Sequence, residues 1–401
     1  MGQHSQNVLF FEGQRSGKLP PNQRLNWRGD SALNDGQDAG VDLVGGYYDA
    51  GDNLKLGFPM AFTITMLSWS AIEFREKLAS KNELQNAIYA IKWGTDYLIK
   101  AHTEANTLYG EVGDPNSDHS CWQRPEDMST PRNSYRINQQ NPGSDLAAET
   151  AAALASASIF FRQINSTYAS TLLNHAIQLF EFASNYQGLY SNSIPVAQKI
   201  YSSSGYKDEL AWAAAWLHRA TRTQSYLDYI QQLGDTGGAR AQFSWDDKYL
   251  GAQILASKLV LEGTVPSSGI WVQYKAEAEQ FICSCTQKSS RKFDKTSGGL
   301  LWFLPWNNMQ YVTTATFAMS VYSKYLSANN ESLNCDGTTV TPLDLNSLVG
   351  DQDVPNPNVL EGAVVSPDRN DNYVDRRDDF QLAEPTTVTN APLLGVLAFL
   401  A

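Results

Sequence analysis

Apolar residues recur at three- and four-residue spacing along most of the chain, whereas strict alternation of apolar and polar residues is scarce. Spacing of this kind is typical of helices that bury one face. The pattern therefore predicts an all-α protein. We expect long helices at residues 58–78, 83–102, 145–162, 168–186, 207–221, 224–233, 246–261, 271–285 and 307–326, and shorter ones near 5–13, 342–348 and 391–401.

The chain shows no internal boundary. No linker rich in glycine, serine or proline divides it, so we predict a single domain over residues 1–401. Asp145 and Thr167 are candidate helix starts. Helices of similar length and even number, without a strict repeat, suit a closed ring of helical hairpins. Functional sites usually lie in the loops of such a scaffold, and the long polar segments are residues 14–57, 103–144, 187–206 and 286–306.

Composition narrows the choice of partners. The net charge of -12 and the lack of a basic run exclude nucleic acid and anionic membrane surfaces as good partners, so a neutral polymer fits better. The chain is rich in aromatic residues, as carbohydrate-binding proteins often are, although most of the rings should lie in the core. Trp212 and Trp216, on one helical stripe, are expected core residues.

The four cysteines leave the redox state open. Cys283 and Cys285 are too close in sequence to pair easily, and a disulfide among the four is neither required nor excluded. No apolar stretch reaches the roughly 18 residues of a membrane span. The N-terminal residues lack the pattern of a secretory signal. Sequons at Asn165 and Asn330 favour export only weakly.

Two acidic segments carry the candidate chemistry. In residues 45–53, Asp49 and Asp52 lie between glycines, which permit close backbone turns, and tyrosines, which can stack on sugar rings. Two neighbouring carboxylates can hold and deprotonate a water. A turn held by aspartate side chains is the alternative. Near the C-terminus, residues 373–391 contain Glu384, an acid that could oppose this pair or simply stabilise the start of the last helix.

A third segment, residues 118–128, gathers a histidine, a tryptophan, an arginine and several carboxylates within eleven residues. This density predicts the wall of a cleft. The alternative is a loop pinned by its own ion pairs and a buried tryptophan.

Together these residues resemble glycoside hydrolase family 9, in particular the plant-type endo-β-1,4-glucanases. The resemblance covers nearly the whole chain, and its motifs occur in the family's order, at residues 10–20, 27–31, 45–53, 122–128 and 373–391.

The resemblance implies an (α/α)6 barrel with an open cleft for one β-glucan chain, and hydrolysis of internal β-1,4-glucosidic bonds with inversion at the anomeric carbon. By the family's motifs, Asp52 is the general base, Asp49 orients the attacking water, Glu384 is the general acid and Asp375 supports the site. Glu384 must then stay protonated while Asp52 stays ionised. Inverting enzymes leave roughly 6.5–9.5 Å between the acid and the base.

The resemblance also implies residues for substrate and metal. The expected sugar contacts are Tyr48, His119, Trp122, Tyr206, Trp245 and Trp306. Some family members bind a structural calcium, for which hard oxygen ligands are suited. In this chain the calcium ligands would be Ser204, Asp208, Glu209 and Asp246. The alternative is that these acids only form an acidic start to the helix near Asp208. The resemblance implies no required cofactor.

One departure from the family pattern stands out. Between residues 341–344 and 355–360 the family carries several dozen further residues, so this domain is internally shortened near 348–355. The absent part holds most of the penultimate barrel helix and a histidine-arginine motif that contacts glucose. All five histidines of this chain precede residue 341. A catalytically impaired glucan-binding protein, or a non-functional truncated paralogue or splice form, is therefore the second hypothesis.

Further expectations complete the prediction. The acidic signatures disfavour a different helical-barrel glycosidase. We expect no carbohydrate-binding module, because the final helix ends the chain, and hence poor action on crystalline cellulose. We also expect a monomer that lies outside the cell or in the cell wall, with no signal peptide visible. The natural glucan stays open.

Overall fold

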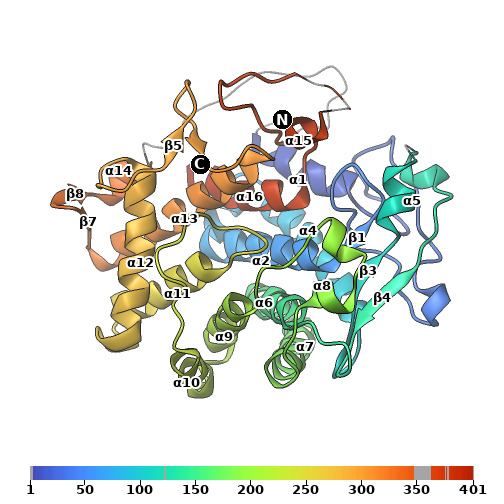
Figure 1. The fold of residues 1–401 in the computed structure, drawn as a ribbon, viewed down its shortest axis with the longest axis horizontal. Coiled ribbons are helices and arrows are strands. Elements are labelled where there is room, and N and C mark those ends of the chain that lie inside the picture. Colours follow the sequence, from blue (N-terminus) through green and yellow to red (C-terminus); the bar gives the residue numbers. More distant parts are fainter. Residues whose placement is uncertain (1–2, 122, 347–362, 375, 377–378, 401) are drawn as a thin grey trace.

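The computed structural model describes residues 3–121, 123–346, 363–374, 376 and 379–400. Helices dominate these residues, as predicted, and Figure 1 shows them gathered around a common centre. The predicted shortening near 348–355, Trp122 and Asp375 lie outside the described residues. The α-helices are α1 (Gln3–Gly13), α2 (Gly57–Glu73), α3 (Arg75–Ser80), α4 (Leu84–Ala101), α5 (Pro115–His119), α6 (Ser144–Phe161), α7 (Ser166–Asn185), α8 (Tyr190–Ser193), α9 (Lys207–Thr221), α10 (Gln224–Leu233), α11 (Tyr249–Leu261), α12 (Gly269–Thr286), α13 (Asn308–Asn329), α14 (Pro342–Asn346), α15 (Phe380–Ala383) and α16 (Thr387–Leu400).

In the described part of the chain, six helices form a closed inner ring. Helices α2, α6, α9, α11, α13 and α16 each pack against the next, and α16 returns to α2. Helices α1, α4, α7, α10 and α12 lie outside this ring. Helix α1 contacts α16, where the side-chain amide of Asn7 donates to the backbone carbonyl of Asn390 at 3.1 Å. This arrangement agrees with the predicted ring of helical hairpins.

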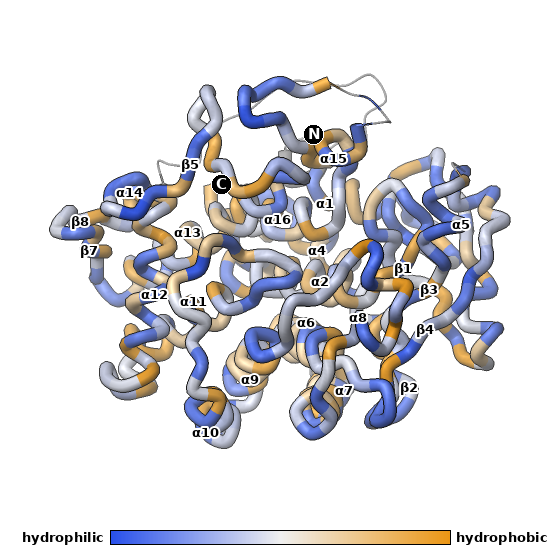
Figure 2. The backbone as a smooth tube through the Cα atoms, in the orientation of Figure 1, coloured by the Kyte–Doolittle hydropathy of each residue, from blue (hydrophilic) through white to orange (hydrophobic). Residues whose placement is uncertain are grey.

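Burial explains the two classes of helix. The inner helices α2 and α6 are buried on almost every face, and the small alanines of α6 permit close packing. The outer helices α4, α7 and α10 are amphipathic, with one apolar face and one polar face each. Figure 2 shows both kinds of residue in α7 and α10. Trp69, Trp212 and Trp216 are fully buried with ring centroids 5.4 to 5.6 Å apart, which confirms the core assignment of Trp212 and Trp216.

The prediction of scarce strands was wrong for the segment 103–144. There β3 pairs antiparallel with its three neighbours, and its residues are all buried. Leu56 lies opposite Glu111, and Glu111 lies opposite Tyr135. Two hairpins, β5–β6 and β7–β8, lie elsewhere. The strands are β1 (Lys55–Leu56), β2 (His102–Glu104), β3 (Thr107–Val112), β4 (Ser134–Ile137), β5 (Asp294–Lys295), β6 (Leu301–Trp302), β7 (Leu333–Cys335) and β8 (Thr338–Val340).

Several predicted helix boundaries shift for local reasons. The segment 58–78 is interrupted at Phe74, whose backbone leaves the helical conformation. The helix predicted at 246–261 begins at Tyr249, after a bridge between Ser244 and Asp247. Asn165, rather than Thr167, caps α7, because its side chain accepts the N–H of Tyr168.

Asp145 is not the N-cap residue of α6, which is Gly143. It lies in the first turn of α6, where its buried carboxylate accepts the N–H of Tyr190 at 2.9 Å. The side chain therefore ties α6 to α8.

A disulfide joins Cys283 of α12 to Cys335 of β7 and settles the pairing that the sequence left open. Cys121 and Cys285 are free, the first exposed and the second buried. Within the described ranges, no helix is both long and apolar enough to cross a bilayer.

Candidate active site

The loop that carries Asp49 and Asp52 precedes α2 and packs against α4. Gly45 and Gly46 have positive φ angles of 111° and 76°. A side chain at Gly46 would clash with the ring of Tyr97, and the indole N–H of Trp93 donates to the Gly46 carbonyl at 2.8 Å. The two glycines therefore allow the loop to lie against α4, as their presence in the motif predicted.

Tyr48 points away from the candidate site. Its ring is 1% exposed, and its hydroxyl donates to Ser31 Oγ at 2.9 Å. The expectation that Tyr48 contacts sugar was therefore wrong.

Asp49 lies buried at the end of the ring where α16 begins. The hydroxyl of Tyr201 donates to Asp49 Oδ2 at 2.5 Å, and the hydroxyl of Thr387 donates to Oδ1 at 3.2 Å. The backbone N–H of Thr387 also donates to the Asp49 carbonyl at 3.0 Å. Burial, followed by the charge of Asp52, raises the pKa of Asp49 to about 7.

Asp52 faces His119. Asp52 Oδ2 lies 3.2 Å from His119 Nε2, at the end of the short helix α5. The hydrogen bond with Asp52 and the charges of Asp52 and Asp118 raise the pKa of His119. The imidazole side chain is half exposed, so it can also be reached from solvent.

Glu384 approaches this loop from the other end of the chain, 333 residues away. The backbone N–H of Gly51 donates to Glu384 Oε1 at 2.9 Å. Burial and the charge of Asp52 raise the pKa of Glu384. Asp49, Asp52 and Glu384 are thus brought together, as the motifs predicted.

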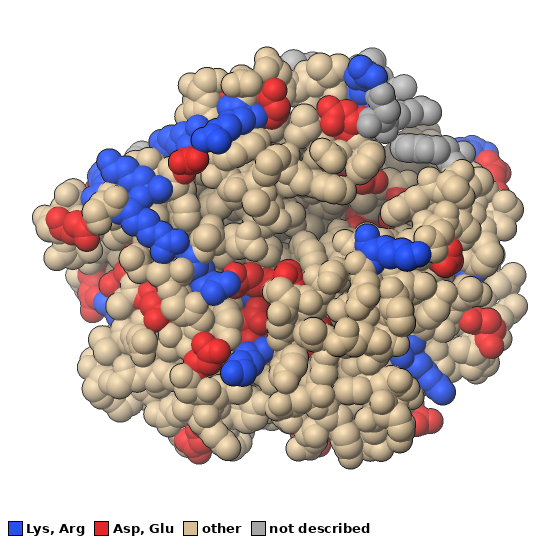
Figure 3. Space-filling view, viewed as in Figure 1, with Lys and Arg blue, Asp and Glu red and all other residues tan. Residues whose placement is uncertain are grey.

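The segment before Glu384 is anchored on the ring. The N–H of Asn307 donates to the carbonyl of Gln381 at 2.9 Å, and the N–H of Ser366 donates to the carbonyl of Leu382 at 2.8 Å. Figure 3 shows that this face of the molecule is hollowed near its centre, between α15 and α5, and that acidic side chains lie in the hollow.

Two further acids border Asp52. Glu111 of β3 is 1% exposed, and neither of its carboxyl oxygens has a hydrogen-bond partner. Burial and the charges of Asp52 and Asp114 raise its pKa to about 8. Asp118 accepts the N–H of Asn53 with Oδ2 at 3.1 Å, and its Oδ1 has no partner. The sequence pattern did not indicate Glu111, since its strand was not predicted.

Two exposed aromatic residues, Trp306 and Phe380, lie near Glu384. Trp306 is 56% exposed and contacts Phe380 edge to face, with centroids 5.6 Å apart. Phe380 was not predicted, although it lies in the same acidic motif as Glu384.

Trp245 and Tyr206 are only half buried. The ring of Trp245 packs 4.6 Å from that of Tyr201, the residue that donates to Asp49. The hydroxyl of Tyr206 donates to Gln187 Oε1 at 3.5 Å. Trp245 is therefore tied to the candidate site through Tyr201.

The residues predicted to hold calcium lie near a buried lysine. Ser204 donates its backbone N–H to Asp246 Oδ1, and Asp208 Oδ2 accepts the backbone N–H of Lys248 at 2.7 Å. Lys248 Nζ forms an ion pair with Glu209 Oε1 at 3.0 Å. The other oxygen, Glu209 Oε2, is buried without a hydrogen-bond partner. Lys248 thus already supplies a buried positive charge to these carboxylates. Asp208 and Glu209 lie in the first turn of α9, as the alternative of an acidic helix start predicted.

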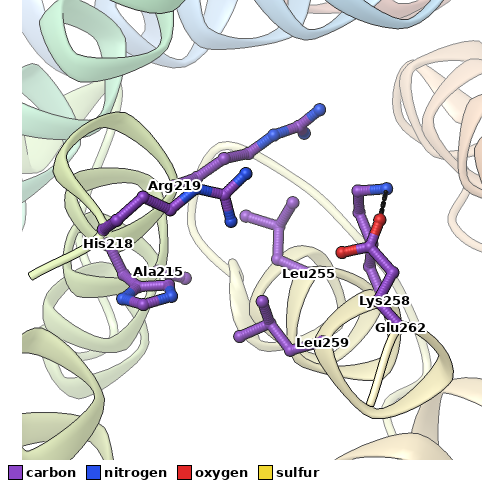
Figure 4. Close-up of a pocket in the computed structure, with 8 residues that line it drawn as sticks. Ala215, His218, Arg219, Leu255, Lys258, Leu259 and Glu262 are labelled. Atoms are coloured by element: carbon purple, nitrogen blue, oxygen red, sulfur yellow. Dashed lines mark hydrogen bonds and ion pairs between the residues drawn. The ribbon is translucent and has the colours of Figure 1, made fainter. Parts of the chain in front are cut away.

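A small cavity of about 30 Å³ lies away from the candidate active site. Figure 4 shows it between the ends of α9 and α11, lined by residues such as His218, Arg219 and Lys258. It contains none of Asp49, Asp52 and Glu384. Its volume suits about one water and not a sugar ring.

Comparison with known proteins gives the family. The model of Glycosyl hydrolase family 9 matches residues 3–340 and 340–397. The chain belongs to glycosyl hydrolase family 9. Family 9 relatives include Endoglucanase 13 of Arabidopsis thaliana, which is 54% identical over 98% of this chain and 91% of its own length, and Endoglucanase 15 of Arabidopsis thaliana, 52% identical over 99% and 92%.

Solved family 9 structures share the fold. The endoglucanase from the termite Nasutitermes takasagoensis matches with a TM-score of 0.85 and 39% identity over 99% of this chain and 97% of that one. Endoglucanase CelQ from Clostridium thermocellum, complexed with cellotetraose, matches with a TM-score of 0.83 and 25% identity over 99% and 69%. The mostly helical fold of this chain is thus that of family 9 enzymes.

Proposed function

We propose that this chain is an endo-β-1,4-glucanase that inverts the anomeric carbon. The observation that carries the proposal is the meeting of Glu384 with the Asp49–Asp52 loop through the Gly51 N–H, at 2.9 Å. Relatives that are identical at more than half of the aligned positions are endoglucanases, and CelQ binds cellotetraose.

Glu384 is suited to protonate the glycosidic oxygen. The raised pKa of its carboxyl favours the protonated form in mild acid, and the Gly51 N–H fixes Oε1. General acid catalysis requires both the proton and its position. The carboxyl is held on a hydrogen-bonded turn and not on a free loop end.

Asp52 takes the role of general base. In this role its carboxylate accepts the proton of the water that attacks the anomeric carbon. Asp49, fixed by Tyr201 and Thr387, orients that water. Asp52 and Glu384 are held by different partners, His119 for the first and the Gly51 N–H for the second.

The aromatic residues are the proposed sugar contacts. Trp306 and Phe380 offer exposed rings beside Glu384, and such rings stack on sugar faces. His119 is the proposed polar contact next to Asp52. We extend the proposal to Tyr206, Trp245, Trp122 and Asp375 from the family motifs alone.

A second candidate function, glucan binding without turnover, rests on a specific observation. The family match breaks into two parts at residue 340, and the alignment with Endoglucanase 13 spans 448 positions, more than the 401 residues of this chain. We propose that the segment absent from this chain includes the body of the penultimate barrel helix and the histidine-arginine motif.

Calcium, location and assembly are also proposals. A calcium ion held by Ser204, Asp208, Glu209 and Asp246 would supply structural support, and Glu209 Oε2 is the oxygen left open for it. An extracellular or cell-wall location is supported by the disulfide, since disulfides persist in oxidising compartments. We also propose that the chain is a monomer.

The calcium proposal can be tested by thermal unfolding. Calcium added after chelation should raise the unfolding temperature of the chain.

The deciding experiment measures reducing ends released from soluble carboxymethyl-cellulose and mixed-linkage glucan by the purified, folded chain. Glu384→Gln should reduce the rate by about 10²- to 10⁴-fold, the usual contribution of a general acid. A rapid fall in viscosity would identify internal cleavage, and proton NMR would identify the first anomer formed.

Binding separates the two candidate functions. A chain that unfolds cooperatively, is stabilised by cellotetraose and releases no reducing ends would be the glucan-binding protein. Equal activity in Glu384→Gln would refute the assignment of the acid.

A further inference from the structure

The proposed base, Asp52, and two side chains beside it have the chemistry of a transition-metal site. Asp52, Asp118 and His119 each offer one ligand atom, and these atoms lie within 4.8 Å of one another. In the described part of the chain they are the sole group of three or more such residues. Ligands at about 2.0–2.1 Å on a tetrahedral ion lie roughly 3.3 Å apart. The 3.2 Å between His119 Nε2 and Asp52 Oδ2 already matches this separation.

A buried oxygen without a partner indicates that the group is incomplete. Asp118 is 5% exposed, and its Oδ1 makes no hydrogen bond, while Oδ2 is occupied by the Asn53 N–H. A buried acceptor left open is costly unless water or a ligand meets it. The half-exposed His119 provides a route by which an ion could enter from solvent.

Two further carboxyl groups border the three side chains. Glu111 lies buried close to Asp52 without a hydrogen-bond partner, and the charge of Asp52 acts on both Glu111 and Glu384. A bound cation would offset the charge of Asp52, which now raises the pKa of both groups. The guanidinium that acts on Asp118, that of Arg132, is already paired with Asp35 at 2.9 Å.

We propose that Asp52, Asp118 and His119 bind a first-row divalent cation such as Zn²⁺, and that this ion inhibits hydrolysis. An imidazole with two carboxylates suits zinc, whereas Ca²⁺ and Mg²⁺ take oxygen ligands. An ion on Asp52 Oδ2 blocks the carboxylate that must accept a proton from the attacking water. The inhibitory part rests on the proposed function, and the binding part does not.

Isothermal titration of ZnCl₂ into the full chain, in chelator-treated buffer, tests the binding. The wild type should bind one zinc ion and should not bind Mg²⁺ at this group. His119→Gln, at a half-exposed position, should weaken zinc binding by at least about tenfold, since even the outer partners of metal ligands contribute about 10- to 100-fold. Asp118→Asn, which keeps the shape, should weaken it likewise.

Cys121→Ser is the matched control, because Cys121 is an exposed thiol two residues from His119 and could hold zinc itself. It should bind zinc as the wild type does. Zinc binding that persists in both His119→Gln and Asp118→Asn, or that disappears in Cys121→Ser, overturns the proposal.

The glucanase assay is then repeated with zinc and after EDTA. Zinc should stop the wild-type reaction, and EDTA should restore it. A chain that binds zinc through His119 but hydrolyses nothing keeps the metal site and refutes the glucanase. An active chain that zinc does not inhibit refutes the inhibition and leaves the glucanase standing.

Discussion

Replacement of Gly51 by alanine tests how closely Glu384 must be held. A Cβ at residue 51 would lie 2.8 Å from Glu384 Oε1, whereas ordinary contact begins at 3.4 Å. Gly51 does not have a positive φ, so alanine can adopt its backbone conformation. The added carbon therefore pushes the carboxyl away by roughly half an ångström and disturbs the 2.9 Å hydrogen bond from the Gly51 N–H.

The size of the effect follows from where the clash falls. The displaced atom is the end of a flexible side chain, so the fold should adjust at little cost, and the unfolding temperature should change by less than about 2 °C. Catalysis is more sensitive, because a misplacement of about 1 Å can cost about 10²-fold in rate. We expect kcat to fall about 10- to 100-fold, which corresponds to about 1.4–2.7 kcal/mol in the barrier.

The assay compares two substrates. On carboxymethyl-cellulose the sugar leaving group needs a proton, so Gly51→Ala should lose the full factor. On an aryl cello-oligosaccharide with a strongly acidic phenol the leaving group needs less help, so the loss should be much smaller. Gly205→Ala is the control, since the nearest atom to its added carbon lies at 3.9 Å. Full activity of Gly51→Ala, or equal losses on both substrates, would refute the reasoning.

Three further predictions concern pH, substrate binding and the disulfide. Burial raises the pKa of Asp49 to about 7 and that of Glu111 to about 8, so both carboxyls bind protons more tightly in the folded chain. Stability should be greatest near pH 5 and fall as the pH rises to 8, measured as the unfolding temperature across that window. Trp306→Ala should raise KM for cello-oligosaccharides several-fold with a smaller change in kcat, because the exposed ring binds sugar away from the bond that breaks. Reduction of Cys283–Cys335, which closes a loop of 52 residues, should remove about 4 kcal/mol of stability, measured by denaturant unfolding with and without reductant.

Each of these predictions has a control. Glu111→Gln should flatten the fall in unfolding temperature between pH 5 and 8, and an unchanged slope would count against Glu111 as its cause. Trp27→Ala, at another exposed tryptophan, should leave KM unaltered. Reductant should have no further effect on the stability of Cys335→Ser, and a large effect there would assign the loss to something other than this bond.

The sequence predicted helices well both where one face is buried, as in α10, and where nearly every face is buried, as in α9. Predicted helices 207–221 and 224–233 coincide with α9 and α10. Apolar spacing failed for β3, whose residues are all buried and so do not alternate. It also ran through the break at Phe74, since an apolar residue there continues the periodicity. Long-range pairing, such as Cys283 with Cys335, leaves no local signal.

For the candidate site, the motifs indicated which residues are involved. They did not indicate which way each side chain points or which segments meet. The sequence indicated Asp49, Asp52 and Glu384, but their meeting depends on contacts 333 residues apart. Tyr48 was misassigned because the motif does not show that its hydroxyl pairs with Ser31, in the segment before it, and that the side chain is buried there. Glu111 was missed because a single glutamate in an unrecognised strand resembles any surface acid.

The anchors of the acid and the base bear on what the shortened segment can affect. Gly51 holds Glu384, Thr387 holds Asp49, and Asn307 holds the turn before Glu384, and all three contacts come from residues outside 347–362. These three anchors of the acid and of its partner Asp49 therefore all lie in the described part of the chain. A missing sugar contact would weaken the binding of substrate and transition state alike, which raises KM and leaves kcat, whereas a lost catalytic contact lowers kcat. If the loss of kcat/KM lies in a raised KM, the chain is an enzyme that binds its substrate weakly. If it lies in a lowered kcat, the chain is closer to a protein that only binds glucan.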